Sequence, residues 1–253
     1  MKAYLLPEMT WPEVEAALGT VEVAIIPVGA HEQHGPHLHE DCDAVLATEY
    51  AKRLTTRLYP HALMTPTINF GLSQHHMNFP GTITLQPETL VSIMRDIVSS
   101  LRHHGIRKFL FLSGHTGNVP ALNIGCQKLS AEMDIEAYYA KTSASAKEAI
   151  EKHIHSPLFG HSCEREVSEA LYLAPHLINR ERLTKGAIRG EGRWRMLRPG
   201  NPIQGPYRYE EMTTNGAIGD ATMSSYAAGR DIVEESLDKL ESASRDLFLV
   251  EDQ

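Results

Sequence analysis

Short apolar runs alternate with longer amphipathic stretches along the first half of the chain. Four runs have the length and the β-branched or aromatic content of buried strands, at residues 23–28, 62–68, 108–113 and 135–140. Between them, apolar residues recur every three or four positions, which predicts helices over 44–58, 87–104 and 119–133. This alternation predicts an α/β fold, with a mostly parallel sheet that helices cover on both faces.

The second half of the chain has a less regular pattern. A polar loop at 155–166 leads into a predicted helix over 166–173, and a long helix is predicted over 224–249. Residues 178–215 are rich in Arg, Gly and Pro without a clear period, which indicates an irregular excursion that covers a site or contacts a neighbouring subunit. No repeat, low-complexity linker or domain boundary interrupts the 253 residues, so residues 1–253 are expected to form one domain.

The most polar loop of the chain follows its first apolar run. Residues 31–43 read His-Glu-Gln-His-Gly-Pro-His-Leu-His-Glu-Asp-Cys-Asp, with four histidines and four acids. Imidazole and carboxylate are the ligands of zinc, manganese and iron, so this loop predicts a metal site. The alternative is a polar surface loop in which Asp43 caps the next helix. Five of its residues are expected to be loop or outer-shell groups and not ligands: His31, His37, His39, Glu40 and Asp41.

Three further polar segments are expected near the same edge of the sheet. His115 follows the third strand between two glycines, and is either a ligand or an exposed turn residue. His75 and His76 precede a Phe-Pro-Gly-Thr turn and either face a substrate or serve the structure. In the loop before 166–173, a glutamate is a ligand or complements the helix beside a capping Ser162, and the sequence leaves open whether Glu164 or Glu166 points inward.

Composition excludes several classes of function. The 24 Lys and Arg against 32 Asp and Glu give a formal charge of −8, with no basic cluster, which argues against a nucleic-acid partner. The turn after the first strand has no glycine-rich phosphate cradle, which argues against nucleotide binding. Three unpaired cysteines fit a reducing cytoplasm, and neither a signal peptide nor a membrane span is expected.

The ordered motifs resemble those of the creatininase family over nearly the whole chain. The resemblance lies in residues 28–38 with Asp43, in 76–82 (His-Met-Asn-Phe-Pro-Gly-Thr), in 114–118 (Gly-His-Thr-Gly-Asn), in 161–168, and in Gly219-Asp220 with Gly229. The spacing Glu-x-His followed by Asp after an apolar strand is specific to this family. The resemblance implies a three-layer α/β/α sandwich.

The same resemblance implies a hydrolase with two divalent ions, zinc, manganese or iron. Glu32, Asp43 and His115 would hold one ion, and His34, Asp43 and a further glutamate the other, with Asp43 bridging. His161 would carry a proton to the leaving group. Family members are similar to one another in forming homohexamers, which is the expected assembly.

Two departures from creatininase itself refine these expectations. Creatininase has a glutamate two residues after the histidine of the third motif, where this chain has Gly117, so Glu166 is predicted as the fifth ligand. Glu164, the second choice, and His76 and Gly117 are expected beside the ions or the substrate. The tryptophans around the creatinine ring are also missing here, since only Trp11 and Trp194 occur.

The expected reaction is therefore attack of metal-activated water on the carbonyl of a small polar substrate, most simply a cyclic or linear amide. Two alternatives stay open. One is hydrolysis of a carbon–carbon bond in a cyclic diketone such as a diketo-inositol. The other is a metal-binding homologue without catalytic activity.

Overall fold

A five-stranded parallel sheet organises the fold. The computed structural model describes residues 2–190, 192, 194–197, 202, 203 and 205–249. Within them the strands lie in the order β1-β3-β2-β4-β5 and every neighbouring pair is parallel. Their bounds are β1 (Tyr4–Leu5), β2 (Val23–Val28), β3 (Ala62–Met64), β4 (Lys108–Ser113) and β5 (Glu136–Lys141). The predicted α/β class with a parallel sheet is confirmed.

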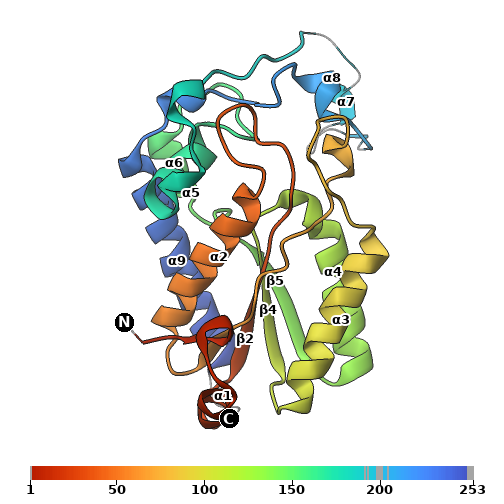
Figure 1. The fold of residues 1–253 in the computed structure, drawn as a ribbon, viewed down its shortest axis with the longest axis vertical. Coiled ribbons are helices and arrows are strands. Elements are labelled where there is room, and N and C mark those ends of the chain that lie inside the picture. Colours follow the sequence, from red (N-terminus) through yellow and green to blue (C-terminus); the bar gives the residue numbers. More distant parts are fainter. Residues whose placement is uncertain (1, 191, 193, 198–201, 204, 250–253) are drawn as a thin grey trace.

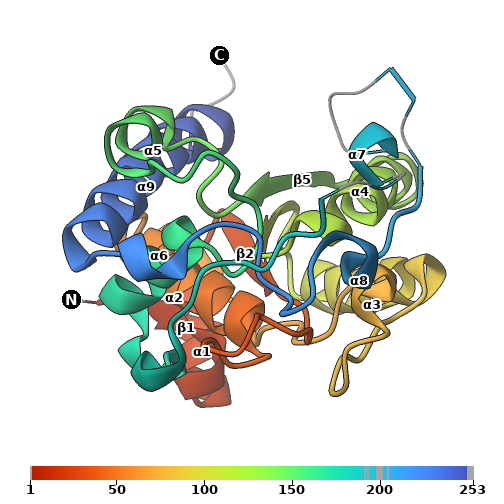
Figure 2. The same ribbon diagram turned by 90° about the horizontal axis from the view of Figure 1, so that it is seen from above.

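Helices cover both faces of this sheet (Figures 1 and 2). One face carries α2 (Cys42–Arg57), α5 (Lys147–His153), α6 (Glu164–Leu173) and α9 (Tyr226–Phe248). The other carries α3 (Pro87–His103) and α4 (Val119–Met133), and α1 (Trp11–Ala17) lies at the far end of the molecule from α7 (Trp194–Leu197) and α8 (Tyr209–Met212). Single 3-10 turns occupy Leu6–Glu8, Gln74–His76, Thr116–Asn118, Pro175–Leu177, Arg180–Arg182 and Ala221–Met223. The layers make the expected α/β/α sandwich.

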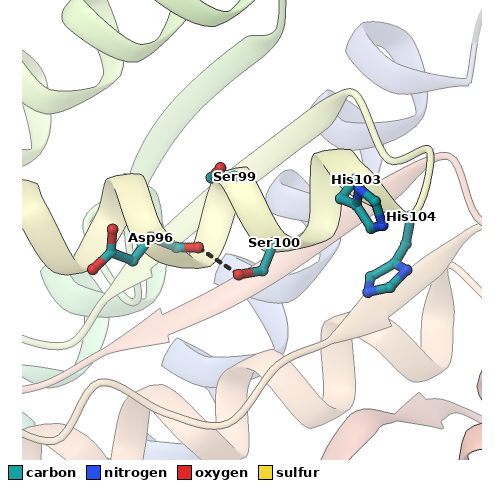
Figure 3. A pocket seen from close by; sticks show the side chains of 5 residues that line it. All are labelled: Asp96, Ser99, Ser100, His103 and His104. Atoms are coloured by element: carbon teal, nitrogen blue, oxygen red, sulfur yellow. Dashed lines mark hydrogen bonds between the residues drawn. The ribbon is translucent and has the colours of Figure 1, made fainter.

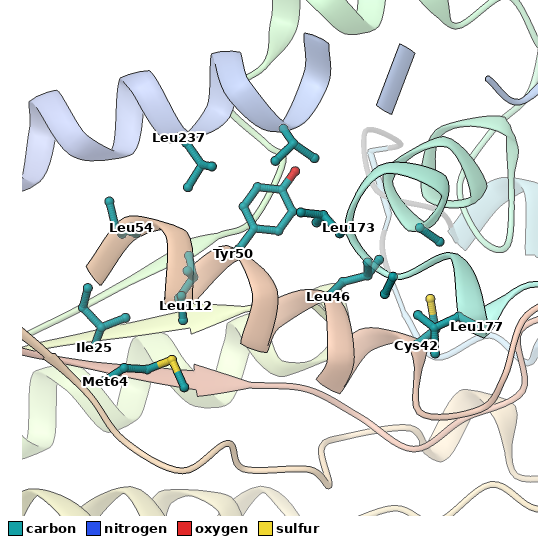
Figure 4. Packing of buried hydrophobic residues seen from close by; sticks show 14 of the residues in the cluster. Ile25, Cys42, Leu46, Tyr50, Leu54, Met64, Leu112, Leu173, Leu177 and Leu237 are labelled. Atoms are coloured by element: carbon teal, nitrogen blue, oxygen red, sulfur yellow. The ribbon is translucent and has the colours of Figure 1, made fainter. Parts of the chain in front are cut away.

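Successive side chains of the central strands point to opposite faces of the sheet and contribute to two hydrophobic cores. In β2, Val23 and Ile25 face the cluster under α2, α6 and α9, while Ala24 and Ile26 face the cluster under α3 and α4. Figure 4 shows part of the first cluster, with Tyr50 and Leu54 of α2 between the sheet and Leu237 of α9. Because both faces of the strand are buried, its sequence is a continuous apolar run, and this is why the sequence predicted it well.

Several boundaries differ from those predicted. The strand expected at 62–68 ends at Met64, because Pro66 has no N–H for the sheet and only Ile68 returns to bridge Val28. Helix α6 begins at Glu164 and not at 166. The helix predicted over 224–249 begins at Tyr226 and ends at Phe248. Sequence reasoning missed β1, α1 and α5, which are short elements whose apolar positions are too few for a period.

The connections after β2 and β4 place the polar loops together. These strands are neighbours in the sheet, and α2 and α4, the helices that follow them, lie on opposite faces. In open α/β sheets such a point of divergence leaves a crevice outside the carboxyl ends of the strands, where ligands bind. The loop of residues 29–41 and the turn of residues 114–118 flank this point.

Candidate metal centre

The polar residues of three distant loops meet above the carboxyl ends of β2 and β4. Glu32 and His34 follow β2, Asp43 lies in the first turn of α2, His115 follows β4, and His161 precedes α6. All five side chains are buried. Asp43 does not cap α2, because Asp41 occupies the N-cap position. The structure therefore brings together these four predicted ligands and the predicted proton carrier, and the fifth predicted ligand, Glu166, lies beside His34 and His161.

Asp43 lies between two imidazoles. Its Oδ1 is 3.3 Å from Nε2 of His34, and its Oδ2 is 3.0 Å from Nδ1 of His115. Burial raises the pKa of Asp43, but the two imidazoles outweigh it and hold that pKa well below its ordinary value. Asp43 is therefore an ionised carboxylate with one oxygen turned toward each histidine.

In His34 and His115, the ring nitrogen that faces away from Asp43 determines the tautomer of the ring. Nδ1 of His34 lies 3.0 Å from the carbonyl oxygen of Glu32, and Nε2 of His115 lies 3.1 Å from the carbonyl oxygen of Leu72. A carbonyl only accepts, so these nitrogens carry the hydrogen. In the neutral rings, Nε2 of His34 and Nδ1 of His115 then direct lone pairs at a carboxylate, an arrangement that calls for a proton or a cation between them.

Burial lowers the pKa of each of these two imidazoles, but the surrounding carboxylates outweigh it. Asp43 is the largest opposing influence on His34, whose pKa rises to about 10. Glu32 is the largest on His115, whose pKa rises to about 9. Without a cation, protons therefore occupy both positions at neutral pH.

Glu32 is a buried carboxylate surrounded by imidazoles. Nε2 of His76 and Nε2 of His115 each lie 3.3 Å from one of its oxygens, and Nδ1 of His161 lies 3.7 Å away. Neither oxygen has a hydrogen bond of ordinary geometry from any residue that the structure describes. Burial raises the pKa of Glu32 to about 7, which His115 partly offsets.

The donor set and its spacing fit a divalent cation. Two atoms that share a tetrahedral zinc ion, each about 2.1 Å from it, lie about 3.4 Å apart. The pairs around Asp43 lie 3.3 Å apart for Nε2 of His34 and 3.0 Å apart for Nδ1 of His115. Two of the four groups of close donors among the described residues are Glu32 with His34 and Asp43, and His34 with His161 and Glu166.

His76 differs from the other histidines of the centre. It is fully buried, and its Nδ1 lies 2.9 Å from Nε2 of Gln33. The Gln33 amide is oriented by its other bonds, since Oε1 accepts from the Gly35 N–H and Nε2 donates to the Gly216 carbonyl. Gln33 therefore donates to His76, and the hydrogen of His76 is on Nε2, directed at Glu32. His76 therefore has no lone pair free for an ion.

The two candidate glutamates in the first turn of α6 have different partners. Oε2 of Glu164 accepts from the backbone N–H groups of His155 and Ser156 and from the Ser156 hydroxyl, at 2.9–3.1 Å. This carboxylate stabilises the loop before α6. Glu166 instead lies with His34 and His161, and its carboxylate accepts from the Ser162 N–H and from Arg165. Ser162 makes this possible with a left-handed backbone, φ 48°.

Gly117 has a steric reason to lack a side chain. A Cβ added there would lie 2.3 Å from Nε2 of His115 and 2.6 Å from the carbonyl oxygen of Leu72. The tight turn that holds His115 thus has no room for a glutamate at this position. A fifth ligand at this centre must come from elsewhere in the chain, and the carboxylate in reach is that of Glu166.

Tyr209, at the start of α8, was not predicted. Its ring centroid lies 3.8 Å from that of His76 and 5.0 Å from that of His161, so the excursion of residues 178–215 reaches over the centre. His75 is half-buried beside it, with its ring 5.4 Å from Tyr209 and 5.6 Å from His115. A paired Tyr-x-Tyr in an irregular segment was the only signal, and its distance in sequence from the other motifs concealed it.

The remaining residues of the first polar loop have other partners. His31 pairs with Glu40 at 3.4 Å, and Nε2 of His37 lies 2.9–3.0 Å from the Ser162 hydroxyl and carbonyl. None of the close donor groups among the described residues contains His31, His37, His39, Glu40 or Asp41. That these five residues are not ligands stays a prediction.

A surface depression lies apart from the centre, on helix α3 (Figure 3). Its lining is Asp96, Ser99, Ser100, His103 and His104, all on or directly after that helix. Ser100 uses its hydroxyl on the helix itself, by donating to the Asp96 carbonyl at 2.7 Å. No residue of the metal centre contributes to this depression.

Comparison with known proteins identifies relatives of the whole chain. A model of one protein family, described as creatininase, creatinine amidohydrolase, matches residues 7–243. The chain is 29% identical over 238 residues to the mycofactocin precursor peptide peptidase of Mycobacterium ulcerans (strain Agy99), covering 90% of this chain and 83% of that protein. It is 27% identical over 263 residues to the 3-dehydro-scyllo-inosose hydrolase of Thermotoga maritima, covering 95% and 82%.

Solved structures of creatininases have the same fold. A crystal structure of creatinine amidohydrolase (creatininase) superposes with a TM-score of 0.83 at 26% identity and covers 99% of this chain and 100% of that one. Structures described as creatininase Mn and as a Zn-Zn type mutant creatininase have TM-scores of 0.81 and 0.80, each at 26% identity over 98% of this chain and 99% of theirs. Known structures of this fold thus include manganese and zinc forms.

Proposed function

Because the chain belongs to the creatininase family, whose members compared above are hydrolases, we propose that it is a hydrolase with two divalent metal ions. Its reaction is attack of activated water on the carbonyl carbon of a small polar substrate. The simplest reaction of this type is cleavage of a C–N amide bond. Zinc, manganese and iron all suit a set of imidazoles and carboxylates.

The proposed ligands are the five that the family resemblance implies, and the distances around Asp43 support them. Glu32, Asp43 and His115 would hold one ion, and His34, Asp43 and Glu166 the other, with one oxygen of Asp43 for each. The observation that carries the proposal is the pair of imidazole lone pairs aimed at Asp43, at 3.3 and 3.0 Å, with both rings held by backbone carbonyls. A proton or a cation stabilises this arrangement, and a metal hydrolase uses the cation.

The proposed chemistry divides between the ions and the protein. Bound ions would lower the pKa of a shared water and polarise the substrate carbonyl. His161 is the proton carrier, because its Nε2 lies 2.6 Å from the carbonyl oxygen of Gln33 and must donate there. Its Nδ1 therefore keeps a lone pair directed into the centre. Burial holds the pKa of His161 well below its ordinary value, so the ring is a neutral acceptor at pH 7.

Elemental analysis of the purified protein tests the ligand assignment. We expect about two divalent ions per chain, and Asp43→Ala is expected to lose both ions together with activity, since one oxygen serves each ion. Asp41→Ala is the matched control, two residues away, exposed, and without a side-chain bond at its capping position. If Asp43→Ala keeps two ions and full turnover, the bridging role is wrong.

The relatives support two further substrate classes. A peptidase and an inosose hydrolase each align with most of this chain, so a peptide amide and a carbon–carbon bond in a cyclic ketone are the second candidates. The ligand set would be the same for all three. A panel of creatinine, short peptides and cyclic diketones, read out by the mass of the products, separates them.

Two further expectations belong to the same proposal. A homohexamer and a cytoplasmic location follow from family resemblance and cysteine content. Sedimentation of the purified protein tests the first. No helix within the described residues has both the length and the apolar character needed to cross a membrane.

A further inference from the structure

A network of half-buried and buried polar side chains connects α6 to α2 behind the metal centre. Arg165 of α6 donates from Nη2 to Oε1 of Glu166 at 3.1 Å, and its Nη1 reaches Oε1 of Glu169 at 3.7 Å and the Ser143 hydroxyl. On the far side, Oε2 of Glu169 accepts from the Tyr50 hydroxyl at 3.0 Å. Tyr50 and Glu169 are almost completely buried, and Figure 4 shows Tyr50 rising from α2.

We propose that Arg165 is a positioning residue that holds Glu166 as a ligand of the second ion. This inference rests on the proposed metal-dependent hydrolase. The Glu166 carboxylate has two fixed donors, Arg165 on Oε1 and the Ser162 N–H on Oε2. Each oxygen retains a further lone pair, so both bonds orient the carboxylate toward His34 and His161 and still leave it free to bind a cation.

Glu169 explains how a cationic side chain can lie beside a cation site. A guanidinium next to a ligand would repel a metal ion unless its charge is balanced. The Glu169 carboxylate provides that balance, and its bond from Tyr50 attaches the pair to α2, whose first turn carries Asp43. The network thereby fixes a ligand on α6 relative to a ligand on α2.

Stepwise zinc binding to chelator-stripped protein, measured by competition with a chromophoric chelator, tests this role. Loss of a residue that orients a metal ligand typically lowers metal affinity about 10- to 100-fold. We expect Arg165→Met to weaken one ion by this factor and leave the other unchanged. Arg165→Lys should recover part of the loss, because it restores one donor to Glu166. Arg53→Met, a half-exposed arginine of α2 that pairs with Glu234, should change neither affinity.

A buried Glu169 without its partner could prevent folding, so a second variant removes that charge too. The double variant Arg165→Met with Glu169→Gln should show the same loss at the same ion. Adding Arg165→Met to Glu166→Gln should produce little further loss, since both changes act through one carboxylate. The proposal is overturned if Arg165→Met lowers the affinity for both ions equally. It is also overturned if the losses from Arg165→Met and Glu166→Gln add independently in the double variant.

The variant Glu166→Gln distinguishes a failure of this inference from a failure of the proposed function. If Glu166→Gln weakens one ion and Arg165→Met does not, the positioning role is wrong and the ligand assignment stands. If Glu166→Gln changes neither affinity, then Glu166 is not a ligand, and the assignment and the inference both fail.

Discussion

At the scale of single residues, the position of each imidazole hydrogen determines what the histidine can do. Backbone carbonyls accept from His34, His115 and His161, so each of these rings presents a lone pair to the centre. Gln33 reverses the direction at His76, whose hydrogen therefore lies on Nε2, the nitrogen that is 3.3 Å from Glu32. Bonds made outside the centre thus determine that three of these four rings present a lone pair to it, whereas His76 presents a hydrogen.

His161→Ala is expected to keep its metal ions and to lose about 10²- to 10⁴-fold in kcat, because a proton carrier is removed while the ligands remain. Elemental analysis together with steady-state kinetics on the substrate identified by the panel measures both. A variant that loses its ions would make His161 a ligand, as its place beside His34 and Glu166 also permits.

Zinc affinity is expected to rise with pH between about 6 and 9. In the metal-free chain the pKa of His34 is raised to about 10 and that of His115 to about 9, so both rings carry a proton that zinc must displace. As the pH falls, these two rings are more fully protonated, so zinc must displace more protons and binds more weakly. At pH 7 roughly two protons should be released per chain at saturation. A pH indicator in weakly buffered solution measures the release, and an affinity independent of pH contradicts this account.

The residues of the centre could be predicted from the sequence, whereas their hydrogen-bond partners could not. Glu32, His34 and Asp43 lie close together in one loop after a buried strand, so their proximity was visible from local order. The choice between Glu164 and Glu166 depended on the left-handed turn at Ser162 and on the loop at 155–156 that binds Glu164. Neither leaves a signal in the spacing. Tyr209 comes from a segment without a period and could not have been assigned.

At the scale of elements, α6, which carries Glu166, packs closely against α9. Gly229 of α9 lies against the backbone of Ser168 on α6, where an added Cβ would be 1.8 Å from the carbonyl oxygen. The Ser168 hydroxyl also accepts from the Ser225 N–H at 3.0 Å, just before α9 begins. This contact fixes α6, and with it Glu166, against the long closing helix.

Gly229→Ala is expected to lower the free energy of unfolding by about 2 kcal/mol or more, because overpacking outweighs the better helix propensity of alanine. Urea denaturation measures it. Gly19→Ala is the matched control, since its new Cβ would meet nothing closer than 3.9 Å. If the two variants are equally stable, α6 and α9 can move apart to accommodate the new Cβ at little cost in free energy.

Element prediction succeeded where burial is continuous and failed where elements are short. Strands β2 and β4 are buried on both faces, and their apolar runs identify them. Strand β1 has two residues and α5 has seven, which is too little sequence for a period to emerge. Their places are set by tertiary contacts, such as the packing of Ala149 and Ile150 against Ile232 of α9.

At the scale of the whole molecule, the metal centre joins segments that are far apart in the chain. Its residues lie between 32 and 43, at 115 and between 161 and 166, with Tyr209 above them. The centre can therefore form only when the sheet, α2 and α6 are all in place. Bound ions would connect the two ends of this arrangement and stabilise the folded state over the unfolded one.

Removal of metal by a chelator is expected to lower the melting temperature by roughly 5 °C or more, since a ligand at about 100 times its Kd adds about 2.7 kcal/mol per site. Differential scanning calorimetry before and after chelation, and after zinc is restored, measures this. Asp43→Ala should show no such recovery with zinc. A melting temperature unaffected by chelation in the unsubstituted chain would argue against metal ions bound in the core.

The excursion over the centre also has an optical consequence. Trp194 is buried in a small cluster with Met212 and Ile218, against which Tyr207 and Tyr209 pack, whereas Trp11 is 76% exposed. A protein that carries Trp11→Phe would have one indole, located in the segment whose tyrosine covers His76 and His161. Its emission wavelength would then report, in real time, whether that segment stays packed while a substrate enters.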